Sequence, residues 1–147
     1  MDHGLMSRNF LFRALEPTKQ RALGALATQR SFQPGEVVFH ENDPGDAMYI
    51  IRTGAVVVEK EGQELARLGS GYHFGEISLV DGFPRSATVR VLEPTELLEI
   101  KRDAFLDVMT SDREAAALVY RSFTYYLCRR LRETNDQLVV LHDQHEE

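Results

Sequence analysis

A chain of 147 residues with 43% hydrophobic and 27% charged residues has the length and composition of a single globular domain rather than of a disordered protein. Its net charge of −6 argues against a nucleic-acid-binding surface, which needs a basic patch, so we expect no DNA binding by this chain alone. The longest apolar run, Ala115–Tyr120, is too short to span a membrane, and Met1–Phe12 lacks a signal peptide's apolar core. The single cysteine, Cys128, can form no internal disulfide. We therefore expect a cytoplasmic protein.

The first predicted elements are helices that precede the main body of the chain. Pro17 suits the first turn of a helix, because a proline there loses no hydrogen bond. Leu15, Leu23 and Leu26 are expected to line the inner face of this helix. A shorter helix is expected over Arg8–Ala14.

Turn residues dominate the middle of the chain. Eight of the ten glycines fall between Gly35 and Gly82, at intervals that suit short strands joined by tight turns. Pro34 followed by Gly35, and Pro44 followed by Gly45, each predict a type II turn, in which proline presets φ and glycine takes a positive φ.

Short runs rich in Val, Ile and Leu lie between these turns and are predicted to be strands: Glu36–Phe39, Met48–Arg52, Ala55–Lys60, Glu64–Leu68, Ala87–Val91 and Glu96–Ile100. With weaker strands near Phe32 and Phe74, about eight strands are expected over residues 30–101. A short helical turn at Glu76–Val80 is the exception in this region. The predicted fold is mainly β, a double-stranded β-helix of the jelly-roll type (a β-roll) with helices on both flanks, in one domain over residues 1–147.

A long helix is predicted after the β-roll. A short helix is expected at Asp103–Met109, and Ser111 or Asp112 can cap the next one. No proline or glycine interrupts Arg113–His142, so the long helix is expected over about residues 112–142. Such a helix would run roughly 45 Å, which is longer than the domain beneath it.

This helix carries two apolar stripes. The first is expected to lie on the β-roll and consists of Ala115, Val119, Phe123 and Tyr126. The second, the seam, has the alternating four-and-three spacing of a coiled coil and consists of Tyr120, Thr124, Leu127, Leu131, Thr134, Leu138 and Leu141. Because the end of so long a helix has nothing of its own domain to rest on, we expect a parallel homodimer with an interface of Leu127, Leu131, Leu138 and Leu141. The alternative is a seam that packs on its own domain.

The segment Phe74–Thr88 carries the most informative chemistry. Gly75 allows close backbone approach, and Glu76 opens a short helix whose free N–H groups favour an anion. Nine residues later, Arg85 offers a planar guanidinium for bidentate phosphate binding, and Ser86 adds a hydroxyl and a backbone N–H. A carboxylate for a sugar hydroxyl beside an arginine for a phosphate indicates a ribose-phosphate site; a buried Glu76–Arg85 salt bridge is the alternative.

This segment resembles the phosphate-binding cassette of cyclic nucleotide-binding domains, which occur in bacterial catabolite activators, in regulatory subunits of cyclic AMP-dependent kinase and in nucleotide-gated channels. The segments Pro44–Asp46 and Tyr49–Gly54 also resemble that family. The resemblance implies that Glu76 accepts a hydrogen bond from the ribose 2′-hydroxyl, with help from the Gly75 backbone, and that Arg85 pairs with the cyclic phosphate. It also implies a phosphate shell completed by backbone N–H groups, in a binding set that further includes Ile77, Ser78, Ser86 and Ala87.

The segment Arg129–Asn135 resembles the part of the bacterial activators that dimerises and contacts the purine. The resemblance implies that Thr134 and Asn135 contact adenine, which favours cyclic AMP; the alternative is that Thr134 only sets the dimer register and Asn135 is solvated. Arg130 either belongs to a solvated face or reaches Glu76 from above.

Neither an enzyme nor a metal site is expected. Metal sites in jelly rolls use a His-x-His pair, and the sequence His73-Phe74-Gly75 lacks the second histidine, so His73 is interpreted as an ordinary loop residue. Cys128, next to the seam, is interpreted as a small apolar residue.

The expected function is that of a homodimeric cyclic nucleotide sensor whose output is a conformational change, with cyclic AMP as the preferred ligand. Ser86 leaves cyclic GMP open as the alternative ligand, since a threonine there is linked to cyclic GMP in the kinase branch. A protein-interaction module on the same fold is a second alternative, although such a module would be expected to lose Glu76 or Arg85. The bacterial activators continue into a DNA-binding helix-turn-helix, so the chain is either a stand-alone sensor or the sensing part of a transcription regulator.

Overall fold

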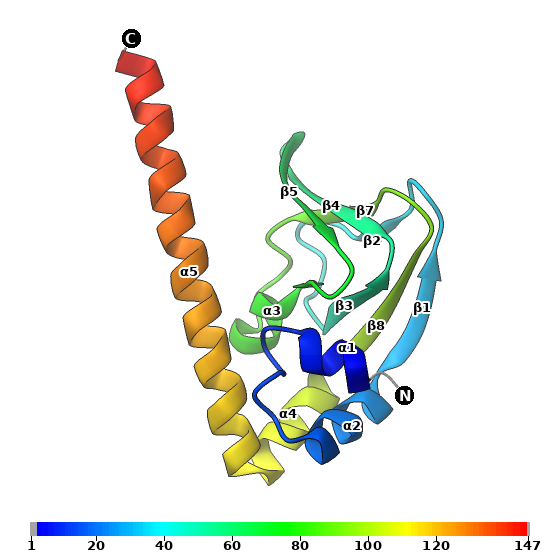
Figure 1. Cartoon of the computed structure of the whole chain (residues 1–147). Helices are drawn as coiled ribbons and strands as arrows, with labels where there is room; N and C mark the ends of the chain where they lie inside the picture. Colours follow the sequence, from blue (N-terminus) through cyan, green and yellow to red (C-terminus); the bar gives the residue numbers. More distant parts are fainter. Residues whose placement is uncertain (1–2, 147) are drawn as a thin grey trace.

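The computed structural model describes residues 3–146, and Figure 1 shows a strand-rich body with short helices at one end and one long helix alongside. Within these residues, eight strands form two four-stranded sheets, in the orders β1-β8-β3-β6 and β2-β7-β4-β5. Neighbouring strands are antiparallel, so the predicted mainly β fold of about eight strands with flanking helices is confirmed. The strands are β1 (Thr28–Phe32), β2 (Val37–Phe39), β3 (Ala47–Thr53), β4 (Ala55–Lys60), β5 (Gln63–Gly69), β6 (His73–Phe74), β7 (Thr88–Val91) and β8 (Thr95–Lys101).

Strand β3 is buried on both faces, which explains its nearly continuous apolar sequence. It pairs with β8, so that Met48 lies opposite Ile100 and Ile50 lies opposite Leu98. Because side chains alternate along a strand, these four residues face an apolar cluster formed with the helices. The intervening residues of β3 face a second cluster, between the two sheets: Ala47, Tyr49 and Ile51.

Helices cover the outer face of this sheet. They are α1 (His3–Arg8), α2 (Pro17–Leu26), α4 (Arg102–Ser111) and the first part of α5 (Arg113–Glu146). Their buried side chains join Met48 and Ile50 in one core, which includes Phe12, Leu23, Phe105 and Val119. This layer of helices places the base of α5 against the β-roll.

The N-terminal segment differs from the prediction in two respects. The helix expected over Arg8–Ala14 is wrong, because α1 ends at Arg8 and the Asn9 side chain accepts a hydrogen bond from the backbone N–H two residues later, which favours turns. Leu15 and Leu23 are buried as expected, but Leu26 is 46% exposed, because it lies at the last residue of α2, where the chain leaves the helix.

The two predicted type II turns have different outcomes. Gly35 has a φ of 87°, and the turn is closed by a hydrogen bond of 3.1 Å from the Glu36 N–H to the Gln33 carbonyl. Gly45 is not among the glycines with a positive φ, so the second turn is wrong. Lack of space requires this glycine instead, since a Cβ there would lie 2.2 Å from the Cβ of Ser78.

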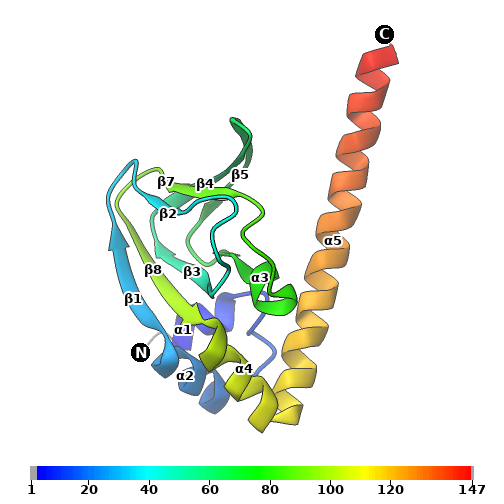
Figure 2. The ribbon, with the colours of Figure 1, turned by 180° about the vertical axis from the view of Figure 1, so that it is seen from behind.

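Helix α5 has 34 residues and is the longest element described. Asp112 caps it, as its Oδ1 accepts a hydrogen bond of 3.0 Å from the Ala115 N–H. The first stripe of the helix packs into the core, with Val119 and Phe123 buried and Tyr126 partly buried. Figure 2 shows the second half of α5 running past the β-roll into open space, and the seam leucines on it are exposed. Among the described helices, none is both long and apolar enough to cross a membrane.

Candidate functional site

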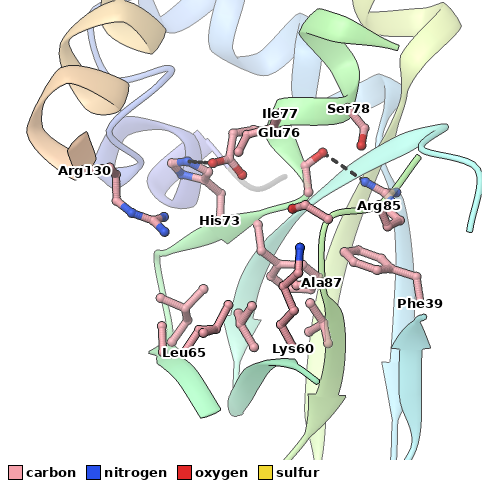
Figure 3. A pocket seen from close by; sticks show the side chains of 17 residues that line it. Phe39, Lys60, Leu65, His73, Glu76, Ile77, Ser78, Arg85, Ala87 and Arg130 are labelled. Carbon is pink, nitrogen blue, oxygen red and sulfur yellow. Dashed lines mark hydrogen bonds and ion pairs between the residues drawn. The ribbon is translucent and has the colours of Figure 1, made fainter. Parts of the chain in front are cut away.

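A pocket of about 300 Å³ lies between the β-roll, the short helix α3 (Glu76–Asp81) and α5. Figure 3 shows Glu76 and Arg85 near one end of this pocket and Leu65 of strand β5 at the other. Most of the polar groups come from α3, from the segment before β7 and from α5, and strands β4 and β6 add Lys60 and His73. Strands supply the apolar wall, which consists of Phe39, Val58, Leu65, Leu68, Phe74 and Val89.

The turn before α3 depends on Gly75. This residue has a φ of 81°, a conformation that favours glycine, and it forms the N-cap of α3. A Cβ at this position would lie 2.8 Å from Nη1 of Arg85 and 3.3 Å from the Ala47 carbonyl. Glycine therefore lets the arginine approach the backbone, and the predicted need for close approach at Gly75 has a direct steric cause.

Arg85 is almost fully buried, with 3% of its surface exposed. Its Nη1 donates to the Gly75 carbonyl at 3.0 Å and its Nη2 donates to the Ala47 carbonyl, while the guanidinium lies 4.0 Å from the centre of the Phe39 ring. Its Nε is buried and has no hydrogen-bond partner among the described residues. Burial lowers the pKa of Arg85, but an arginine keeps its charge in a protein, so the pocket contains a fixed cation.

Glu76 is also buried, with 4% of its surface exposed, at the first position of α3. Burial raises the pKa of its carboxyl, against the lowering effects of a backbone hydrogen bond and of the charges of Arg130 and Arg85. Arg85 makes its ion pair with Asp46, at 4.0 Å, and no salt bridge joins it to Glu76 in the described part of the chain. The alternative of a Glu76–Arg85 salt bridge is therefore wrong, and the two charges line the pocket separately.

The other predicted binding residues of the segment Phe74–Thr88 also line the pocket. Ser78 is buried on α3, and Ala87 is buried just before β7. Ile77 and Ser86 are exposed and also line the pocket. The sequence thus folds into two short segments that line a single pocket.

Of the predicted residues on α5, Arg130 reaches the pocket. Its Nη1 donates to the Tyr126 hydroxyl at 3.1 Å. No ion pair joins it to Glu76 among the described residues, although its charge acts on that carboxylate. Thr134 and Asn135 are exposed and lie outside the lining of the pocket. The structure thus gathers eight of the ten predicted binding residues around one pocket and leaves out the two expected to contact the base.

Sequence reasoning missed several residues of the pocket. His73, interpreted as a loop residue, is buried in β6 with 3% exposure, and its ring centre lies 4.6 Å from that of Tyr126, so that interpretation is wrong. The signal in the sequence that could have placed His73 near the site was its position three residues before Glu76. Phe39 and Lys60 also line the pocket, but only strand pairing brings them there. No group of three or more His, Cys, Asp or Glu in the described residues is placed to hold a metal ion.

The chemistry of the pocket suits a small ligand with three different parts. A buried guanidinium binds phosphate oxygens well, because charge-assisted hydrogen bonds are strong and the fork is planar. A buried carboxylate accepts hydrogen bonds from hydroxyl groups. An apolar wall of strand residues suits a flat ring, so the pocket can hold a phosphate, a sugar hydroxyl and a base together.

Comparison with known proteins gives a family for this chain that agrees with the chemistry of the pocket. The family model "Cyclic nucleotide-binding domain" matches residues 29–112, which include α3 and Arg85. The cyclic AMP receptor protein of Thermus thermophilus is 35% identical over 89% of this chain and 61% of its own length. The cGMP-dependent protein kinase of Eimeria tenella is 38% identical over 67% of this chain, which corresponds to 10% of the kinase.

A solved structure shares the fold over nearly the whole chain. The crystal structure of the N-terminal domain of a transcriptional regulator from Streptomyces coelicolor A3(2) has a TM-score of 0.74 and 33% identity, and the match covers 91% of this chain and 94% of that one. This chain spans about three fifths of the length of the Thermus receptor, so the likeness to full-length proteins concerns one part of them. The residues matched by the family model include Glu76, Arg85 and every other residue that lines the pocket except Arg130. Fold, site and sequence therefore agree, and the chain belongs to the cyclic nucleotide-binding domain family.

Proposed function

We propose that this chain binds a cyclic nucleotide, prefers cyclic AMP, and acts as a homodimeric sensor. The observation that carries the binding is the presence of two buried charges, Arg85 and Glu76, in one pocket without a salt bridge between them in the described part of the chain. Burying charges is costly unless each has a partner. A cyclic phosphate would supply an acceptor for the Nε of Arg85, and a ribose 2′-hydroxyl would donate to Glu76.

The preference for cyclic AMP is supported by the hydroxyl of Thr134. Its Oγ1 donates to the Arg130 carbonyl at 2.9 Å, one turn earlier in α5. Because the hydroxyl proton is used in this bond, the oxygen can only accept from a ligand. Adenine presents an amine donor where guanine presents a carbonyl acceptor, so this hydroxyl favours adenine. The names of the relatives include both cyclic AMP and cyclic GMP, so cyclic GMP is the alternative ligand.

The homodimer is supported by the exposed seam on α5. In the single chain Leu131, Leu138 and Leu141 are each more than half exposed, at the spacing of a coiled coil. A second α5 would cover them and would also bring Thr134 and Asn135 toward the pocket of the other chain. A ligand that closes the pocket against α5 would then shift the helix pair, by as much as its affinity differs between the two arrangements.

Calorimetric titration with cyclic AMP tests the binding site. Charge-assisted hydrogen bonds contribute about 1.5–3 kcal/mol each, so Arg85→Ala should weaken binding roughly 10- to 150-fold. Arg85→Lys should recover little of this loss, because the planar fork is absent. Arg67→Ala is the matched control, since Arg67 is an exposed arginine whose ion pair with Glu64 lies outside the pocket lining.

Two outcomes would contradict the proposal. If Arg85→Ala binds cyclic AMP as tightly as the wild-type chain, the site is wrong. If the folded wild-type chain binds neither cyclic AMP nor cyclic GMP, the interaction-module alternative is favoured. Tighter binding of cyclic GMP would keep the site and overturn only the base preference.

A further inference from the structure

The side chain of Asn9 determines which nitrogen of His73 carries the proton. Asn9 is fully buried, and its Oδ1 accepts a hydrogen bond of 3.0 Å from the Leu11 N–H, so the oxygen and nitrogen of the amide are assigned by their partners. Its Nδ2 donates to the Gly71 carbonyl at 3.1 Å and lies 3.2 Å from Nδ1 of His73. An amide nitrogen can only donate, so Nδ1 of His73 accepts and the imidazole proton lies on Nε2.

This Nε2–H group faces the carboxylate of Glu76. Nε2 is buried and makes no hydrogen bond with the described residues, and Oε1 of Glu76 is 3.9 Å away. Figure 3 shows the two side chains pointing toward one another, with Arg130 on the far side of the imidazole. Burial, together with the charge of Arg130, lowers the pKa of His73 to about 4, so the ring is neutral near pH 7.

The imidazole has little freedom to turn away from Glu76. Asn9 holds one edge of the ring, and the Tyr126 ring of α5 packs on it with 4.6 Å between ring centres. The Tyr126 hydroxyl in turn accepts the hydrogen bond of Arg130. Thus the group next to Glu76 is held from two sides, by the N-terminal segment and by α5.

We infer that His73 is a positioning residue, whose Nε2–H holds the Glu76 carboxylate in place to accept the ribose 2′-hydroxyl of the bound nucleotide. This inference rests on the proposed function. A closure of about 1 Å would turn the contact of 3.9 Å into a charge-assisted hydrogen bond. The carboxylate would then keep one oxygen on His73 and present the other to the ligand, as a buried carboxylate with several acceptor sites can do.

The first test is the tautomer itself, measured on the unaltered chain. Two-bond ¹H–¹⁵N correlation spectra of ¹⁵N-labelled protein at pH 7 distinguish the two neutral tautomers and the imidazolium. His73 should appear as the neutral Nε2–H form. An Nδ1–H form, or an imidazolium, would overturn the inference without any mutation.

The second test compares two ligands that differ by one hydroxyl, cyclic AMP and 2′-deoxy cyclic AMP. His73→Phe should weaken the binding of cyclic AMP about 10-fold and change that of the deoxy compound less than about 2-fold, because only the first uses the positioned carboxylate. His73→Gln should recover part of the loss, since its amide N–H reaches toward the place of Nε2. His40→Phe is the matched control, because His40 is exposed and outside the pocket lining.

The outcomes separate this inference from the proposed function. Equal losses for the two ligands in His73→Phe would show a merely structural role and overturn the inference, while the binding site would stand. A wild-type chain that binds neither ligand would overturn the proposed function, and the ribose role of Glu76 would fall with it.

Discussion

The two halves of helix α5 each carry an apolar stripe, but the stripe is buried in the first half and exposed in the second. In the first half, the stripe formed by Ala115, Val119 and Phe123 is buried against the helices and the sheet of its own chain. In the second half, the stripe formed by Leu131, Leu138 and Leu141 is exposed. Helical periodicity predicts which face of a helix is apolar, but it does not predict what covers that face.

The difference has a physical cause in the length of the helix. The first half rests on α4, where Phe105 contacts Phe123 with 6.2 Å between ring centres. The second half leaves the β-roll, as Figures 1 and 2 both show. Most of the stability of a helix in a protein comes from packing of its apolar face rather than from the helix itself. The second half lacks such packing within its own chain, so we expect a partner, such as the second chain of the proposed homodimer, to stabilise it.

Removing a buried ring from the first half should have the largest effect on stability. Phe123→Ala should lower the free energy of unfolding by about 3–5 kcal/mol, because the ring is 3% exposed and its loss leaves a cavity. Tyr125→Ala, two residues further on and exposed, should change it by less than about 0.5 kcal/mol. Chemical denaturation measures both, and similar losses would contradict the described packing of α5.

A charge in the seam should separate the two chains of the proposed homodimer. Leu138→Asp would bury an unpaired carboxylate between helices, which should weaken association by about 3 kcal/mol or more, or over 100-fold in Kd. Val139→Asp is the matched control, because this exposed neighbour lies off the seam and should leave the dimer intact. Light scattering distinguishes the two variants. A wild-type chain that is monomeric at micromolar concentration would refute the homodimer.

The sequence predicted the elements whose determinants are local. Turn glycines and short apolar runs indicated the strands, and Ser111 or Asp112 indicated the start of α5, of which Asp112 proves to be the cap. Gly75 and Arg85 were identified from a motif, since the two segments that contain them lie close together in the chain and both line the pocket. The turn, cap and motif signals that were read in this way each span only a few residues of the sequence.

The features that the sequence did not predict depend on contacts between distant segments. His73 is buried because the N-terminal segment and α5 both pack on it. The guanidinium of Arg85 is held by the Ala47 carbonyl, which periodicity cannot assign. Gly45 is required by the closeness of Ser78 rather than by a turn. No local pattern contains these partners.

Tyr126 lies at the junction of the two halves of α5 and packs on the buried ring of His73. Because His73 is buried, the free energy of unfolding should depend on pH. Above about pH 6.5 the imidazole is neutral in both states; as the pH falls toward 4, the unfolded chain binds a proton that the folded chain does not. The free energy of unfolding should therefore decrease over this interval, by about 3 kcal/mol at most for this group.

The difference between the wild-type chain and His73→Phe isolates this effect. Glu76, which faces His73, has a raised pKa in the folded state, so its own contribution falls as the pH rises and has the opposite sign. Denaturation at several pH values should show that, below about pH 6.5, the free energy of unfolding decreases more steeply for the wild-type chain than for His73→Phe. Parallel profiles would mean that the pKa of His73 is the same in the folded and unfolded states, contrary to the described burial.

The smallest predicted effect concerns the seam residue that we propose to contact the base. Thr134→Val keeps the shape of the side chain and removes the acceptor, so it should cost about 1–2 kcal/mol in cyclic AMP binding and leave cyclic GMP binding nearly unchanged. Thr124→Val is a close control, because Thr124 also lies on the seam and also donates to the carbonyl one turn earlier, at 2.9 Å, but it is far from Thr134 along the helix. Calorimetric titration of each of these two variants with each of the two nucleotides gives four affinities to compare with those of the wild-type chain. A loss for cyclic AMP in Thr134→Val alone would show that the second half of α5 reads the base, in addition to its proposed role in joining two chains. Equal losses for both nucleotides, or none, would leave this half with the proposed role in assembly alone.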